Sequence, residues 1–167
     1  GLAKQGMKPV VALYSTFLQR GYDQIIQDIG LLQLPVVLAI DRAGLVGDDG
    51  PTHHGVFDVG FLRQIPGMKI LAPVSLEEQQ QMLRWAVKEC RGPVAVRYPR
   101  GAEGSYTASD WQGPDGPQVV AHRKGKDLTF VTYGRMLDNV LAAAELLHNQ
   151  GIEATVLRVM TLSDIVS

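Results

Sequence analysis

One continuous apolar run, LPVVLAID at 34–41, constrains the fold of this chain more than any other sequence feature. A strand that is apolar on both faces has to be buried on both, which is typical of parallel sheets covered by helices. Similar runs occur at 10–14 and 92–99, and segments with helical patterning lie between the runs at 16–32 and 75–90. The alternation predicts an α/β fold with a mainly parallel sheet and helices on both faces.

The composition changes at 99–118, which is rich in Gly, Pro, Ser and Asp and is typical of a linker. Beyond it the pattern predicts a hairpin or two strands turning at Gly125, an amphipathic helix ended by Gly151, and a last strand. These elements are too few for a complete sheet. We therefore predict two domains, 1–113 and 114–167, of which the second is only the start of a further α/β unit.

The bulk composition excludes several classes of function. Sixteen basic and seventeen acidic residues give a net charge of −1, which supports neither nucleic acid nor a membrane surface as partner. The single cysteine, Cys90, excludes an internal disulfide and fits a reducing compartment. We expect a cytoplasmic bacterial protein. The first residues read like the interior of a longer protein, so we expect a fragment and leave a plastid location open.

A crowded loop, DRAGLVGDDGPTHHGVFD at 41–58, contains most of the titratable side chains of interest. Three interpretations fit its composition. It could be a Gly-rich surface loop with Asp as turn former, or a metal site, although it matches no EF-hand or HExxH pattern. Alternatively, it performs acid–base and hydrogen-bonding work on a polar substrate, for which His is well suited. Spacing alone leaves all three open for Asp48, Asp49, His53 and His54.

Arginines follow three of the predicted strands at the point where each strand ends. Parallel sheets bind ligands beyond the carboxyl ends of their strands, so Arg20, Arg42 and Arg100 could converge there from three loops. A guanidinium fork bonds two phosphate oxygens at once and stays charged, which suits a phosphate group. Each arginine taken singly is more often a solvated or salt-bridged surface group.

Three segments resemble a known family. They are YSTFLQRGYDQI at 14–25, IDRAGLVGDDGPTHHGVFD at 40–58 and AVRYPRG at 95–101. Their order and spacing are similar to those of the 1-deoxy-D-xylulose-5-phosphate synthases, a branch of the transketolase group of thiamine diphosphate enzymes. The resemblance implies a pyrimidine-binding domain followed by part of the family's C-terminal domain. It also implies a transferase that condenses pyruvate with D-glyceraldehyde 3-phosphate, losing carbon dioxide, for isoprenoid, thiamine and pyridoxal synthesis.

The resemblance assigns binding roles to five side chains. Phe17 is expected against the aminopyrimidine ring of thiamine diphosphate. The phosphate of D-glyceraldehyde 3-phosphate is expected to be held by Tyr14, Arg42 and Arg100, with Arg20 nearby.

The resemblance also assigns the loop residues. Asp49 and His53 are expected to contact the reacting part of the substrates and to help move protons. His54 and Asp48 fall at positions without an assigned role, and no residue is assigned as a metal ligand.

The family's activating glutamate and its Mg²⁺–diphosphate motif would lie upstream of Gly1. The chain alone is therefore expected to be inactive and to bind thiamine diphosphate weakly at best, needing the N-terminal diphosphate-binding domain and forming a homodimer when complete. Two alternatives stay open. The chain could be another enzyme of the transketolase group, or a non-catalytic or split-subunit module that needs a partner chain.

Overall fold

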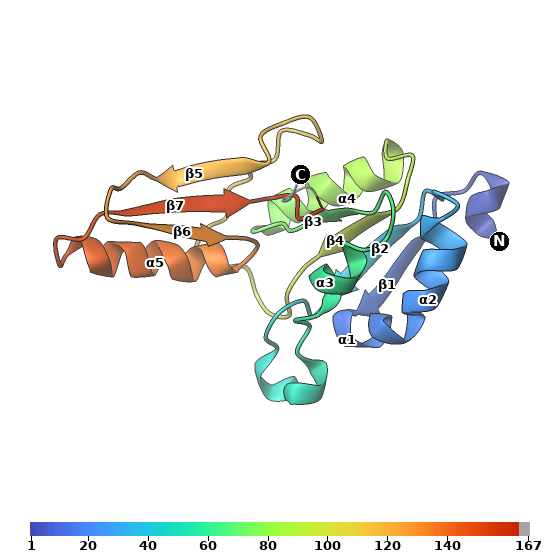
Figure 1. Cartoon of the computed structure of the whole chain (residues 1–167), viewed down its shortest axis with the longest axis horizontal. Coiled ribbons are helices and arrows are strands. Elements are labelled where there is room, and N and C mark those ends of the chain that lie inside the picture. The colour runs from blue at the N-terminus through green and yellow to red at the C-terminus, as the bar shows by residue number, and fades with distance from the viewer. Residues whose placement is uncertain (164–167) are drawn as a thin grey trace.

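Two sheets organise the computed structural model, which describes residues 1–163 (Figure 1). The first sheet is four-stranded and parallel throughout, in the order β1-β2-β4-β3. Its strands are β1 Val10–Tyr14, β2 Val37–Asp41, β3 Lys69–Leu71 and β4 Val94–Arg97. The mainly parallel sheet predicted from the apolar runs is confirmed.

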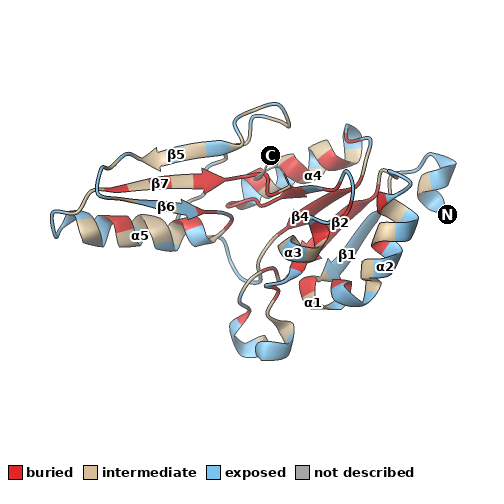
Figure 2. Ribbon diagram, in the orientation of Figure 1, coloured by how far each residue is buried: buried red, intermediate tan, exposed pale blue. Residues whose placement is uncertain are grey.

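Helices cover both faces of this sheet, as predicted. On one face α4, Leu76–Lys88, packs Met82 against Val37 and Val94. On the other face Leu38 packs with Leu18 of α1, Ser15–Leu18, and with α3, Asp58–Leu62. Alternate residues of β2 therefore enter different cores, which explains why the whole run is apolar. Figure 2 shows the two inner strands, β2 and β4, buried, whereas the edge strand β1 is more exposed.

The segment after β1 is helical but irregular. The pattern predicted one amphipathic helix over 16–32, whereas the structure has four short turns. They are α1, the 3-10 turn Gln19–Gly21, α2 Tyr22–Gln24 and the π-helical turn Ile25–Gly30. Gly21 lowers helix propensity in the middle of the segment, and π turns are frequent beside functional sites.

The second sheet has the order β5-β7-β6. Its strands are β5 Val119–Arg123, β6 Leu128–Thr132 and β7 Ala154–Val159, and α5, Met136–His148, packs on it. Of the two alternatives predicted at Gly125, two strands that turn there are confirmed and a hairpin is wrong, because β7 lies between β5 and β6 and pairs with both. Gly125 approaches the backbone closely, since a Cβ there would lie 2.3 Å from the carbonyl oxygen of Glu153.

A buried ionic cluster joins the two sheets. Arg158 of β7 and Glu78 of α4 are both fully buried and form an ion pair. Arg158 Nη1 also lies 2.8 Å from Asp110 Oδ2 in the connecting segment. Ser75 caps α4, since its hydroxyl accepts from Glu78 N, and the Glu78 carboxylate accepts in turn from Val74 N. Glu78 thus ties three segments together.

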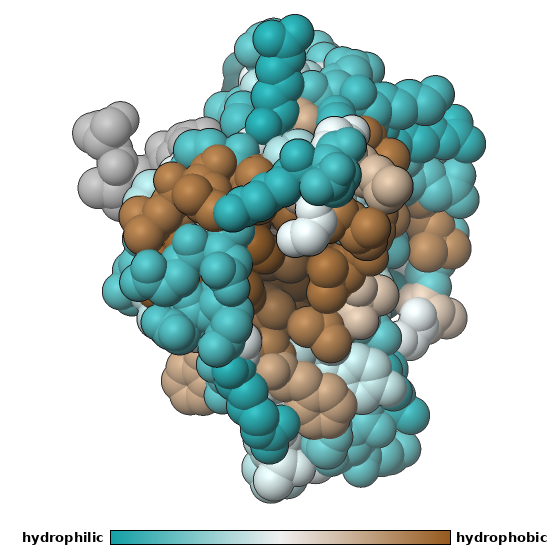
Figure 3. All heavy atoms as spheres, turned by 90° about the vertical axis from the view of Figure 1, so that its right-hand side faces the viewer, coloured by the Kyte–Doolittle hydropathy of each residue, from teal (hydrophilic) through white to brown (hydrophobic). Residues whose placement is uncertain are grey.

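The outer side of β1 carries a large apolar surface. Figure 3, which views this side of the molecule, shows apolar side chains gathered at its centre. The exposed apolar residues of β1 and of the turn before it are Leu2, Met7, Val10, Val11 and Leu13. An edge strand with exposed apolar faces is typical of a surface that further protein covers.

Candidate functional site

The residues predicted as a site lie together at the carboxyl ends of β1, β2 and β4. β1 and β2 pair so that Tyr14 lies beside Asp41, and the predicted site residues follow directly after both strands at this edge. The loop after β2 extends from the body of the molecule, at the bottom of Figure 1. Direct contacts connect all seven predicted side chains, which are Tyr14, Phe17, Arg20, Arg42, Asp49, His53 and Arg100.

Arg42 is the most constrained of these residues. Its backbone is left-handed, with φ of 56°, which costs a residue with a side chain about 1–3 kcal/mol. Its guanidinium lies 3.8 Å from the centre of the Tyr14 ring and bonds two carboxylates. Arg42 Nη1 is 3.0 Å from Asp41 Oδ2, and Arg42 Nε is 2.8 Å from Asp49 Oδ2. Asp41 had no predicted role, although it stands directly before Arg42.

Arg100 reaches the same carboxylate oxygen from the loop after β4. Its Nε lies 3.5 Å from Asp49 Oδ2, and its Nη1 donates to the carbonyl oxygen of Val46. The hydrogen bond from Arg42, together with the charges of Arg100 and His53, lowers the pKa of Asp49. The same bond raises the pKa of Arg42. Arg42, Arg100 and Asp49 are thus brought together from the loops after β2 and β4.

The aromatic side chains form the other half of the cluster. The Tyr14 and Phe17 rings stack with centroids 5.0 Å apart, and His53 meets Phe17 edge-on at 5.6 Å. Arg20 lies 5.8 Å from the Phe17 ring, beside a cavity of about 270 Å³ that Phe17, Arg20 and Thr16 help to line. Phe17 is 42% exposed. The cluster therefore offers one partly open aromatic surface beside a cavity.

The two histidines of the loop have different surroundings. His53 Nδ1 lies 3.0 Å from the Thr52 hydroxyl, and within residues 1–163 no aspartate bonds the imidazole. Acid–base chemistry would have been supported by such an aspartate, but Asp49 is engaged by the arginines. His54 Nδ1 instead accepts from Val46 N at 3.2 Å and so fixes the loop.

Glycines close the base of the loop. Gly44 and Gly55 exchange two backbone hydrogen bonds, of 2.7 and 2.8 Å. A Cβ on Gly55 would lie 2.3 Å from the Arg42 carbonyl oxygen and 2.6 Å from Ser15 Cβ. Gly55 is therefore needed for the loop to lie against the turn after β1, a role that its place in a Gly-rich loop did not predict.

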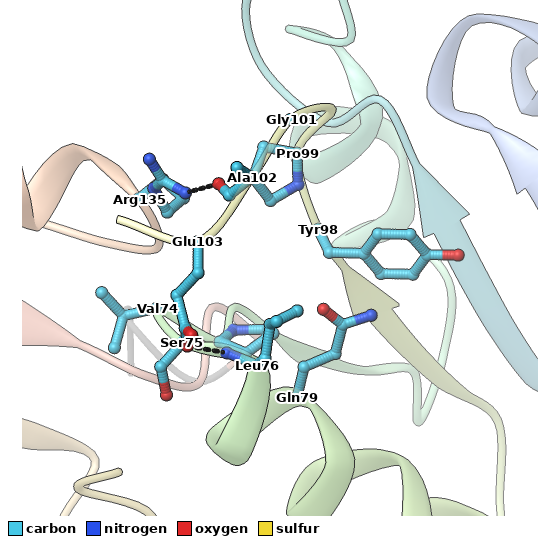
Figure 4. Close-up of a pocket in the computed structure, with 11 residues that line it drawn as sticks. Val74, Ser75, Leu76, Gln79, Tyr98, Pro99, Gly101, Ala102, Glu103 and Arg135 are labelled. Carbon is cyan, nitrogen blue, oxygen red and sulfur yellow. Dashed lines mark hydrogen bonds between the residues drawn. The ribbon is translucent and has the colours of Figure 1, made fainter. Parts of the chain in front are cut away.

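The chain that follows Arg100 is anchored to the start of α4 and to the residue before α5. In Figure 4, Glu103 accepts a hydrogen bond from the backbone N–H of Leu76, the first residue of α4. Arg135, just before α5, donates to the carbonyl oxygen of Ala102. Only a small cavity, of about 40 Å³, separates these segments. The segment after β4 that carries Arg100 is therefore held at its far end by these two hydrogen bonds.

Neither a membrane-spanning helix nor a cluster of metal-binding side chains is found among the described residues. Within 1–163, no helix is long and apolar enough to cross a membrane. The same residues contain no group of three His, Cys, Asp or Glu side chains placed to hold a metal ion.

Family models match both parts of the chain. The model described as "Transketolase, pyrimidine binding domain" matches residues 1–104, which is more than half of the chain. The chain belongs to the transketolase family. The model "Transketolase, C-terminal domain" matches residues 118–165 of this family member. The last four residues of the second predicted domain, 164–167, lie outside the described residues.

Curated relatives confirm the more specific resemblance. The chain is 49% identical over 158 residues to the 1-deoxy-D-xylulose-5-phosphate synthase of Gloeobacter violaceus, covering 93% of this chain and 25% of the relative. It is 52% identical over 157 residues to that of Heliobacterium modesticaldum, covering 93% and 24%. The chain spans about a quarter of the length of these relatives.

Solved structures confirm the fold. A structure titled "Split gene transketolase, inactive beta4 tetramer" superposes with a TM-score of 0.79 at 26% identity, covering 93% of this chain and 50% of that one. A transketolase mutant from Pichia stipitis in complex with fructose 6-phosphate gives a TM-score of 0.80 at 18% identity, covering 95% and 24%.

Proposed function

We propose that this chain is the pyrimidine-binding part, with a portion of the C-terminal part, of a 1-deoxy-D-xylulose-5-phosphate synthase. The transketolase family to which it belongs depends on thiamine diphosphate. The complete enzyme would condense pyruvate with D-glyceraldehyde 3-phosphate and release carbon dioxide. The observation that carries the proposal is the convergence of Arg42 and Arg100 on one carboxylate oxygen of Asp49.

This convergence supports a phosphate site. Asp49 Oδ2 marks a point within reach of two guanidinium groups, and an oxygen of a phosphate could take that place. Arg and phosphate form charge-assisted bonds that are about twice as strong as neutral ones. Tyr14 holds the Arg42 guanidinium against its ring and so orients it. Arg20 adds a third positive charge beside Phe17.

The residues around Phe17 fit the pyrimidine end of the cofactor. A partly exposed aromatic ring beside a cavity suits a flat heteroaromatic ring. Thr16 lines that cavity, and among the described residues its hydroxyl has no hydrogen-bond partner, so it could bond a polar ring edge. When bound, thiamine diphosphate supplies the electron sink for decarboxylation. Its Mg²⁺–diphosphate end would be held by the other domain.

Asp49 and His53 would handle hydroxyl groups and protons of the substrates. The Thr52 hydroxyl bonds Nδ1 of His53, which leaves Nε2 as the atom that could accept or donate a proton. Its edge-on contact with Phe17 places this ring beside the proposed pyrimidine surface. The role of His53 is thus to move a proton next to the cofactor ring.

Replacing Arg100 in the complete enzyme tests the phosphate site. We expect Arg100→Ala to raise KM for D-glyceraldehyde 3-phosphate about tenfold, because it removes one charge-assisted phosphate contact. Steady-state kinetics with both substrates varied would show it. A change confined to the KM for pyruvate would contradict the assigned role.

A second candidate is a split-subunit module that works only with a partner chain. The structural neighbour whose title reads "Split gene transketolase, inactive beta4 tetramer" favours it, because that protein has the same fold over 93% of this chain. Either way, we propose that these residues alone are inactive and bind thiamine diphosphate weakly. Carbon dioxide release on mixing with a separately produced N-terminal domain would favour the split-subunit candidate.

A further inference from the structure

The Asp49 carboxylate lies against the same two guanidinium groups, of Arg42 and Arg100, that the proposed function assigns to the substrate phosphate. One of its oxygens lies 2.8 Å from Arg42 Nε and 3.5 Å from Arg100 Nε. The hydrogen bond from Arg42 lowers its pKa, so the carboxylate is ionised at neutral pH. A ligand anion that bonds both guanidinium groups has to share them with Asp49 or displace it.

The carboxylate is a good competitor because it is tethered. A group on the same chain acts at a high effective concentration, which a free anion has to overcome. A single carboxylate offers the arginines no more charge than Asp49 already does. A phosphate dianion offers twice the charge and three acceptor oxygens, so it can bond both forks. Binding through Asp49 displacement would therefore be measurable for phosphate and negligible for a monocarboxylate.

The loop geometry permits Asp49 to move. Asp49 ends the short turn Gly47–Asp49, and the flanking Gly47 and Gly50 have φ of 62° and 79°. No atom lies within 4 Å of the position that a Cβ would take on either glycine. Glycines in open space can change their dihedral angles readily. Asp49 can thus leave the arginines while Gly44 and Gly55 keep the base of the loop closed.

We infer that Asp49 is an internal anion that occupies Arg42 and Arg100 until a phosphate dianion displaces it, and so keeps singly charged carboxylates out of this site. The inference rests on the proposed phosphate site. It gives Asp49 a role in the ligand-free state, in addition to any contact with the reacting groups. In a synthase whose second substrate, pyruvate, is a monocarboxylate, this competition would prevent pyruvate from occupying the phosphate position.

Anion titrations of this chain and of Asp49→Asn test the inference. Methyl phosphate and acetate are the probes, at about pH 8 where the phosphate is a dianion. Binding is followed by NMR on the Nε signals of Arg42 and Arg100. Since a bond to a charged group is worth about 1.5–3 kcal/mol, we expect Asp49→Asn to tighten methyl phosphate binding about tenfold or more. Acetate should gain by a similar factor and become measurable.

The matched control is Asp48→Asn, which removes the same charge from the exposed neighbouring residue. It should change both affinities less than about threefold, because exposed charges are screened. Asp49→Ala should repeat the gain if asparagine itself bonds the arginines. Weaker or unchanged phosphate binding by folded Asp49→Asn and Asp49→Ala would overturn the inference. If neither the unsubstituted chain nor the Asp49 variants bound methyl phosphate, the phosphate site itself would be wrong.

Discussion

Arg158→Ala should lower the free energy of unfolding of this chain by about 3–5 kcal/mol, the cost of breaking a buried ion pair by removing one partner. Arg158 and Glu78 are both fully buried, so the substitution leaves the Glu78 carboxylate without its main counter-charge. It also removes the bond to Asp110, through which the connecting segment is attached to β7. Arg158 thus contacts three segments at the junction of the two sheets, because it also donates to the carbonyl oxygen of Ala72.

Urea unfolding followed by circular dichroism measures this change. Arg123→Ala is the matched control, because Arg123 lies on the neighbouring strand β5 and pairs with Glu145 and Glu153 at the surface. Exposed pairs of this kind contribute about 0–1 kcal/mol. Equal losses for Arg158→Ala and Arg123→Ala would show that the buried cluster does not join the two sheets as described.

The second large effect concerns Arg42 in the complete enzyme. We expect Arg42→Ala to lower kcat/KM for D-glyceraldehyde 3-phosphate about 100-fold or more, since about 3 kcal/mol is lost with a charge-assisted phosphate contact. The effect should exceed that of Arg100→Ala. Arg42 is clamped by Asp41, Asp49 and the Tyr14 ring, whereas the Arg100 side chain is 43% exposed.

Two further variants separate charge from geometry. Arg42→Lys keeps the positive charge but loses the planar fork, so it should recover only part of the activity. Arg63→Ala, an exposed arginine at the end of α3, should leave the kinetics unchanged. If Arg42→Ala retained the unsubstituted enzyme's KM for the aldehyde phosphate, Arg42 would not bind the phosphate.

The first sheet was predictable because its inner strands, β2 and β4, are buried on both faces and are therefore continuous apolar runs. The second sheet was harder to predict. β7 lies between β5 and β6 and pairs with residues more than twenty positions away in the sequence, and no local pattern indicates such pairing. The segment 15–30 departs from a regular helix for a partly local reason, the glycine at 21. Its π turn also packs Gly30 against Ile65, a contact that exists only in the folded chain.

The residue types of the site could be predicted from the sequence, but the contacts between their side chains could not. Arginines after strands and a crowded loop indicated a polar ligand, and the family resemblance named the members. The sharing of Asp49 by two arginines depends on the left-handed backbone at Arg42 and on the close fit of Gly55, which are tertiary features. Arg158 was missed because a polar residue in a strand usually indicates a surface, and its partner Glu78 lies 80 residues away.

The most direct test of the central claim is a transplant. This chain replaces the matching segment of the Heliobacterium modesticaldum synthase, to which it is 52% identical over 157 residues. Carbon dioxide release from pyruvate is then measured with D-glyceraldehyde 3-phosphate or with unphosphorylated D-glyceraldehyde as acceptor. We expect turnover with the phosphorylated acceptor, which Arg42→Ala largely abolishes. A folded, thiamine diphosphate-binding transplant that was inactive, or that used both acceptors equally well, would contradict this expectation.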